Sequence, residues 1–215
     1  MNIFITSFDS KEAASHLDDL RLNKMVLETA QLLSSAYRHL FGNNELLYKD
    51  THFNHPCAIW ARKNIDSYSW LVQYFDDLTK EKISRDKTIK SEKEIKPHKS
   101  WQDLFELFNS KKTDDYKDKI SAEFFDFNCT DFKEEKDVRI AYQKQMIKKW
   151  RSDLRPPKWT GVNRPVFLKI SQLNSYLFQG ILAINFAKPH QPVIPAFIKP
   201  SPAINGNISQ LLPKK

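Results

Sequence analysis

The stretch that decides the fold is SHLDDLRLNKMVLETAQLLSS, residues 15–35. Its apolar residues recur at intervals of three and four, the spacing that buries one side of an α-helix. The side expected to be buried carries Leu22, Met25, Val26, Ala30, Leu33 and, just beyond, Tyr37. The opposite side carries Arg21, Lys24, Glu28, Gln31 and Ser35. The stretch therefore predicts an amphipathic helix that holds an arginine, a lysine and a glutamate as neighbours on one rigid face.

Capping residues predict where this helical region begins and ends. Asp9 and Glu12 form an acidic version of the capping box, so a helix is expected to begin near Ser10. The sequence leaves open whether that helix runs unbroken into the next one or pauses over residues 16–19. Gly42 is suited to end the second helix.

Three further helices are predicted downstream. Pro56 suits the first position of a helix that ends near Arg85 and has apolar residues at helical spacing, namely Ile59, Ile65, Tyr68, Val72, Phe75 and Leu78. A short amphipathic helix is expected around Trp101, followed by an irregular segment over residues 111–131. The last helix is expected over residues 134–152, with Val138, Tyr142, Met146 and Trp150 on its buried side.

Prolines dominate the end of the chain. They preclude long helices over most of the segment after Asp153, although residues 166–184 can hold one. The predicted fold class is all-α. We expect a compact helical domain over residues 1–160 and a Pro-rich extension over residues 161–215, packed on the domain or trailing from it.

Composition narrows the class of protein. The 215 residues suffice for one compact domain, and four glycines disfavour Gly-rich phosphate loops. The sequence lacks an apolar run long enough for a transmembrane helix, and its start does not resemble a signal peptide. Two cysteines are too few for a disulfide framework, which favours a cytoplasmic location. The net charge of +8 favours an anionic partner, with nucleic acid the first choice.

The loop HFNHPCAIW, residues 52–60, contains metal-ligating side chains. His52, His55 and Cys57 have a spacing that can bind zinc, but a closed structural site needs four ligands. His98 and Cys129 stand alone in the sequence. We therefore expect neither a metal nor a cofactor, and we expect the two loop histidines to brace the loop or contact phosphate.

A basic segment over residues 142–169 has the composition of a nucleic-acid-binding surface. Its cations are Lys144, Lys148, Lys149, Arg151, Arg155, Lys158, Arg164 and Lys169, set against the single acid Asp153. Cations neutralise phosphates, and planar rings stack on exposed bases. Trp150 has the helical spacing of a core anchor, whereas Trp159 follows two prolines and is the better stacking candidate. The alternative interpretation is a basic surface on which both tryptophans serve the core.

The polar face of the first stretch indicates glycosidic chemistry. A carboxylate such as Glu28 can stabilise the positive charge that develops on a sugar when its glycosidic bond breaks. An amine such as that of Lys24, near another cation, can act as a nucleophile. The sequence contains no P-loop, no GxGxxG motif and no Ser/His/Asp order.

Two segments together resemble a known family. The residues Leu17, Asp18, Arg21, Leu22, Lys24, Glu28, Gln31 and Leu33, followed by His55, Pro56 and Trp60, match the pattern LDxxRLxKxxxExxQxL and then HPxxxW. This pattern resembles the phage and bacterial branch of the pyrimidine-dimer DNA glycosylase (endonuclease V-like) family. The similarity covers about the first 85 residues.

The resemblance implies a compact all-α enzyme that binds duplex DNA and flips a nucleotide out of the stack. It implies a DNA glycosylase of DNA repair, with or without an apurinic-site lyase activity. Glu28 and Arg21 would fill the glutamate and arginine roles, with Lys24 as a third catalytic candidate. The DNA-binding candidates are His52, His55, Arg62, Gln31, Trp159, Lys158, Arg155 and Lys149.

The sequence leaves the nucleophile, the activity and the oligomeric state open. Asn2 and Ile3 depart from the family pattern at the amino terminus, so the nucleophile is the amino-terminal amine, Lys24 or water. The chain can also be a non-catalytic nucleic-acid-binding protein on the same scaffold, or an enzyme that cleaves glycosidic bonds of free nucleotides. The sequence does not indicate the oligomeric state.

Overall fold

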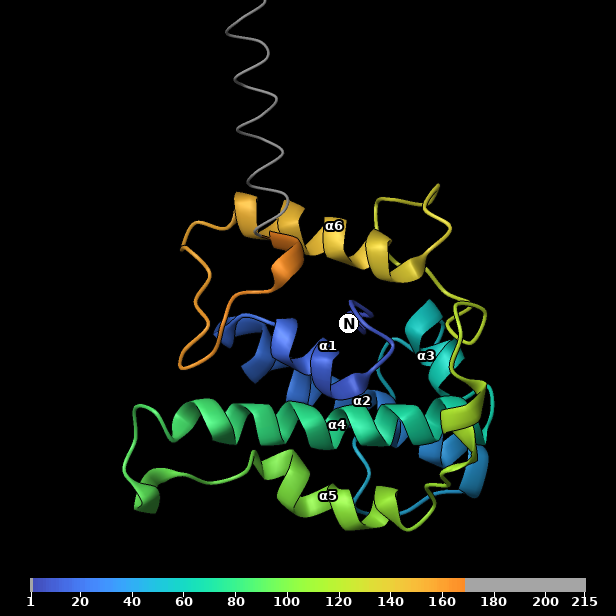
Figure 1. Ribbon diagram of the computed structural model, residues 1–215. Helices are drawn as coiled ribbons and strands as arrows, with labels where there is room; N and C mark the ends of the chain where they lie inside the picture. Colours follow the sequence, from blue (N-terminus) through green and yellow to red (C-terminus); the bar gives the residue numbers. More distant parts are fainter. Residues whose placement is uncertain (1, 169–215) are drawn as a thin grey trace, which may run out of the picture. The chain divides into compact units, whose positions relative to one another are not determined.

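Two long helices, α2 (Asp19–Phe41) and α4 (Ile65–Asp86), pack side by side at the centre of the fold (Figure 1). The computed structural model describes residues 2–168. Helix α2 begins after Asp18, whose carboxylate accepts the backbone N–H groups of Leu20 and Arg21, and it ends at Gly42. The six apolar residues predicted to face the core are all buried. Ser35, predicted on the polar side, is also buried.

The remaining helices surround this pair. They are α1 (Ser10–His16), α3 (Pro56–Ala61), α5 (Lys99–Asn109) and α6 (Val138–Ser152), with two short 3₁₀ helices, η1 (Glu92–Glu94) and η2 (Asp115–Lys119). The part of the chain that the structure describes has no strand, and the prediction of an all-α fold is confirmed. The same described part has no helix long and apolar enough to cross a membrane.

Capping side chains and extended residues separate the helices from one another. Asp9 caps α1 by accepting the backbone N–H of Glu12, and the chain is extended at Leu17, so α1 and α2 are separate helices. The prediction of a single helix from Pro56 to Arg85 is wrong. It is interrupted at residues 62–64, because the Asn64 side chain accepts the N–H of Ser67 and starts α4.

The short helix α3 also explains one misplaced core residue. Ile59, predicted as buried, is 49% exposed. Because α3 has only six residues, its buried side is fully supplied by Cys57, Ala58, Trp60 and Ala61. The prediction treated residues 56–85 as one helix and therefore placed Ile59 on the buried side of α4. Because α3 is a separate helix, a different set of its residues faces the core.

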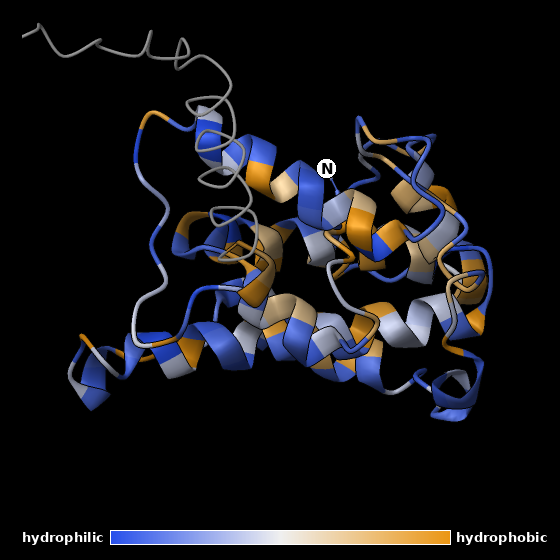
Figure 2. Ribbon diagram, turned by 45° about the horizontal axis from the view of Figure 1, so that its top comes forward, coloured by the Kyte–Doolittle hydropathy of each residue, from blue (hydrophilic) through white to orange (hydrophobic). Residues whose placement is uncertain are grey.

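Aromatic side chains make up much of the buried core. Figure 2 shows how hydrophobic residues alternate with hydrophilic ones along the helices. Trp60 stacks on Phe125 with ring centroids 5.4 Å apart, and its indole N–H donates to the carbonyl of Phe124 at 2.9 Å. These contacts attach the irregular segment after η2 to α3. The segment predicted as irregular over residues 111–131 contains the short 3₁₀ helix η2 and no α-helix.

Helix α6 lies over the amino-terminal segment, which separates it from α1 (Figure 1). The Tyr142 ring meets Phe4 edge to face, and the Gln143 side chain donates to the carbonyl of Thr6 at 2.9 Å. The four residues predicted on the buried side of α6 are all buried. The helix begins at Val138, four residues later than expected.

The described residues after α6 pack on the same body. The Phe167 ring stacks on Trp150, with centroids 6.0 Å apart and an interplanar angle of 12°. Within the described residues, the packing therefore continues across the boundary predicted at residue 160. Residues 166–168 are helical, and the rest of the helix expected over residues 166–184 lies outside the described residues, as does Lys169.

Candidate active site

The polar face of α2 lines a cavity of about 370 Å³. Its lining residues come from three separate segments: Asn2 and Phe4 from the amino terminus; Leu20, Arg21, Lys24, Met25 and Glu28 from α2; and Lys149 from α6. We call this cavity the Glu28 pocket. The fold therefore brings together all three residues predicted as catalytic and one residue predicted to bind DNA.

Glu28 and Lys24 form an ion pair at the edge of the pocket. The two residues are one helical turn apart, and Lys24 Nζ lies 3.1 Å from Glu28 Oε1. The Glu28 side chain is 15% exposed, whereas that of Lys24 is 72% exposed. The carboxylate is thus largely enclosed, and the ammonium group lies at the solvent side of the pair.

Arg21 lines the pocket but is held by two carboxylates. Its guanidinium donates to Asp18 at 2.8 Å and to both oxygens of Asp153 at 2.8 and 3.0 Å. Burial lowers the pKa of Arg21, but the hydrogen bonds with Asp153 and Asp18 outweigh it and leave that pKa raised. The side chain is therefore a fixed and largely neutralised member of the pocket wall.

Asp18 connects this wall to α6. Its carboxylate caps α2, pairs with Arg21 and also accepts the indole N–H of Trp150 at 2.7 Å. Trp150 follows Lys149 directly in α6. This buried hydrogen bond therefore positions Lys149 at the pocket.

The amino-terminal segment is fixed at the same place. The Asn2 side-chain oxygen accepts the hydroxyl of Tyr142 at 3.0 Å and the thiol of Cys57 at 3.4 Å. Sequence reasoning did not single out Asn2 or Phe4 as site residues. The signal that pointed to this segment was its amino-terminal amine, which is one of the three candidate nucleophiles.

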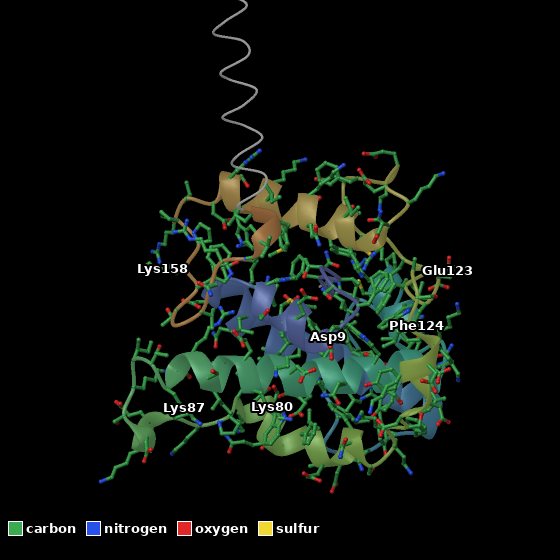
Figure 3. All side chains as sticks on the ribbon, in the orientation of Figure 1. Asp9, Lys80, Lys87, Glu123, Phe124 and Lys158 are labelled. Atoms are coloured by element: carbon green, nitrogen blue, oxygen red, sulfur yellow. The ribbon has the colours of Figure 1, made fainter. Side chains whose placement is uncertain are left out.

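The other predicted DNA-binding residues lie outside the lining of the Glu28 pocket. His52 is exposed, and the Arg62 guanidinium lies 3.7 Å from the centroid of the Phe53 ring. Arg155 and Lys158 are exposed on the loop that follows α6. Figure 3 labels Lys158 on this loop. Gln31 is partly exposed on α2.

Trp159 is buried, although its position in a loop indicated an exposed ring that could stack on a base. Its indole N–H donates to the carbonyl of His16 at 3.1 Å. Its ring also meets Trp150 edge to face, with centroids 4.9 Å apart. Both tryptophans are therefore core anchors, and this packing leaves little of the Trp159 ring free to stack on a base.

His55 braces its loop, which was one of its two expected roles. Its Nδ1 atom accepts the backbone N–H of Cys57 at 3.2 Å and caps α3. Burial, followed by nearby positive charge, lowers the pKa of His55. A neutral imidazole is the form that this cap requires.

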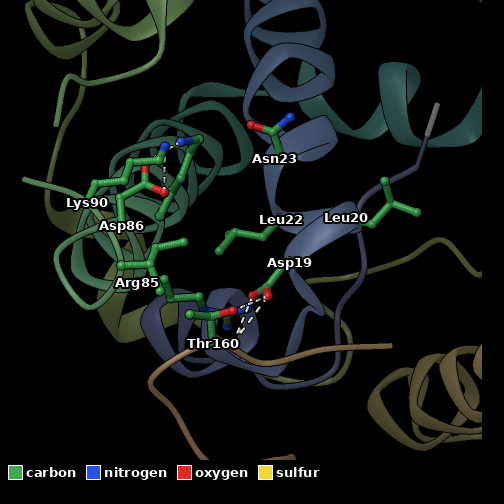
Figure 4. Close-up of a pocket in the computed structure, with 10 residues that line it drawn as sticks. Asp19, Leu20, Leu22, Asn23, Arg85, Asp86, Lys90 and Thr160 are labelled. Carbon is green, nitrogen blue, oxygen red and sulfur yellow. Dashed lines mark hydrogen bonds and ion pairs between the residues drawn. The ribbon is translucent and has the colours of Figure 1, made fainter. Parts of the chain in front are cut away.

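A second cavity, beside the start of α2, is less suited to chemistry (Figure 4). Arg85 is 4% exposed there and binds Asp19 and the carbonyls of Ser15 and Leu17. Two lysines of the same cavity pair with Asp86. Arg85 therefore holds α4 against the junction of α1 and α2, whereas the lysine pairs with Asp86 are local to α4 and the turn that follows it.

Comparison with known proteins places this architecture in a family. The family model described as pyrimidine dimer DNA glycosylase matches residues 1–124. The chain belongs to this family. Membership in the pyrimidine dimer DNA glycosylase family confirms the resemblance found in the sequence and supports a DNA glycosylase, an enzyme of DNA repair that acts on DNA. No curated protein and no solved structure gives a significant match.

Proposed function

We propose that the chain cleaves the N-glycosidic bond of a damaged or modified base in duplex DNA, and that the reaction takes place in the Glu28 pocket. The observation that carries the proposal is the convergence of Glu28, Lys24, Arg21 and Lys149 on one cavity. A nucleotide flipped out of the duplex would bring its sugar to the enclosed carboxylate.

The proposed roles follow from exposure and charge. Glu28 stabilises the positive charge that develops on the sugar as the glycosidic bond breaks. Lys149, which reaches the pocket from α6, neutralises a phosphate beside the flipped nucleotide. Arg21, held by Asp18 and Asp153, keeps the wall rigid and contributes by positioning.

Phosphate contacts outside the pocket belong to the same proposal. The residues that supply them are His52, Arg62, Gln31, Arg155 and Lys158, which are at least partly exposed. Such contacts fix the register of the protein on the duplex without reading its sequence.

A lyase step requires an amine. In this part of the proposal, an amine attacks the sugar C1′ atom and displaces the base, which takes up one amine proton. The C1′–O4′ bond then breaks as the second proton passes to O4′, which leaves an imine at C1′. Loss of a proton from C2′ then eliminates the 3′ phosphate and cleaves the strand. Lys24 is the amine candidate on α2, and Asn2 brings the amino-terminal segment to the same pocket. Borohydride reduction should trap the imine, and peptide mapping then shows whether Lys24 or the amino-terminal peptide carries the DNA.

The decisive experiment is Glu28→Gln, assayed for base release from duplexes that carry ultraviolet photoproducts or modified bases. We expect base release, measured by mass spectrometry, to fall at least about 100-fold. We expect folding and duplex binding to persist, because an ion pair between neighbouring turns of one helix contributes no more than about 1 kcal/mol. Glu45→Gln, in an exposed loop, is the matched control.

Two outcomes would overturn the proposal. Unchanged base release by Glu28→Gln would remove the carboxylate from catalysis. Absence of base release by the unaltered protein from every duplex, together with intact duplex binding, would favour the non-catalytic alternative.

A further inference from the structure

Three metal-ligating side chains meet beside the Glu28 pocket. The ligand atoms of His55, Cys57 and Cys129 all lie within 4.8 Å of one another. The two cysteines are 72 residues apart in sequence, and their sulfurs lie 3.7 Å apart. The expectation that Cys129 is isolated was therefore wrong, because the segment after η2 folds back onto α3.

The spacing of the sulfurs matches a tetrahedral metal site. Two thiolates bound to one zinc ion at about 2.3 Å lie about 3.8 Å apart. A disulfide requires a sulfur–sulfur distance of about 2.05 Å, and both cysteines are free in the structure. We propose that His55, Cys57 and Cys129 bind a zinc ion.

The chemistry of each ligand is compatible with zinc. Cysteine sulfur and imidazole nitrogen are the ligands that zinc prefers, and both kinds of atom meet here. His55 Nδ1 presents a lone pair, since it accepts the Cys57 N–H. This nitrogen would exchange the backbone N–H for the metal. A bound metal deprotonates a coordinating thiol, so both cysteines can bind as thiolates.

The fourth position has a candidate within the chain. Asn2 Oδ1 lies 3.4 Å from Cys57 Sγ, close enough to complete the site, with water as the alternative ligand. Asn2 also lines the Glu28 pocket. The zinc ion would therefore tie the amino-terminal segment, the start of α3 and the segment around Cys129 together beside the pocket. This proposal does not depend on the glycosylase proposal.

The first test measures zinc in the full chain, purified with reductant from zinc-supplemented cells and then passed through a desalting column. We expect one zinc ion per chain by mass spectrometry of the metal. Cys129→Ser should lose it. His55→Asn retains a residue that can cap α3 and should bind zinc at least about tenfold more weakly. His52→Ala, the matched control in the same loop, should retain zinc.

The second test replaces zinc with cobalt. We expect thiolate-to-cobalt charge-transfer absorption in the original protein and in His52→Ala, and a reduced band in Cys129→Ser. Circular dichroism verifies that each variant is folded. Zinc content that is negligible, or that is unchanged in Cys129→Ser, would overturn the proposal. A Cys57–Cys129 disulfide in the protein purified with zinc and reductant would also overturn it.

Discussion

Trp150 donates its indole N–H to the carboxylate of Asp18 across a distance of 2.7 Å, and both side chains are buried. The same carboxylate caps α2 and pairs with Arg21. One acidic side chain thus joins the start of α2, the wall of the Glu28 pocket and α6.

Asp18→Ala should destabilise the protein by about 2–4 kcal/mol. The substitution removes a helix cap, which costs about 1 kcal/mol, and leaves the buried indole N–H of Trp150 unpaired, at about 1–3 kcal/mol. Arg21 keeps its pairing with Asp153. Urea denaturation measures the change. Asp9→Ala, which removes the exposed cap of α1, should cost less. Equal losses in the two variants would contradict this role of Asp18.

Lys149→Ala should reduce the salt dependence of duplex binding. Each phosphate contact contributes about 0.9 to the slope of log affinity against log salt concentration, so one lost contact should lower the slope by about 1. Lys93→Ala, in η1 and away from α6 (Figure 1), is the control and should leave the slope unchanged. An unchanged slope in Lys149→Ala would mean that Lys149 does not contact a DNA phosphate.

Stability should increase with pH over the range just below 6.5, partly through His16. Burial lowers the pKa of His16 from its ordinary value of 6.5, with an opposing contribution from Glu12. Between the folded and unfolded pKa values, His16 is protonated in the unfolded chain but largely neutral in the folded chain. The free energy of unfolding therefore rises with pH over this range. His98, whose pKa is also lowered by burial, acts in the same direction.

Denaturation at several pH values checks this expectation. His16→Gln should flatten part of the dependence. Glu12→Gln should steepen it, because the carboxylate that favours protonated His16 is removed. Asp137 and Arg139 line the same cavity as His16, so the comparison is restricted to pH values above the carboxylate range. Identical slopes in His16→Gln and the original protein would refute the assignment.

Local patterns predicted the helices well where one face alone decides burial. The buried side of α2 and the caps Asp9 and Gly42 follow from spacing and from backbone chemistry within a few residues. The break before α4 also had a local signal, the capping residue Asn64, which the longer apolar periodicity obscured.

Local patterns could not predict contacts between residues that are far apart in the sequence. Trp159 follows two prolines in a loop, but its burial depends on the carbonyl of His16, 143 residues away. Cys129 acquires neighbours only because its segment returns to α3. Arg21 was expected on a polar face, whereas its partner Asp153 lies 132 residues away.

The pairing of Arg21 with Asp153 has an evolutionary consequence. The family match ends at residue 124, so this ion pair links the shared segment to one that lies beyond the match. Relatives that keep the arginine at position 21 should also keep an acid at position 153, because without it the guanidinium retains Asp18 as its one carboxylate partner. Covariation of these two positions would mark the descendants that inherited both segments together.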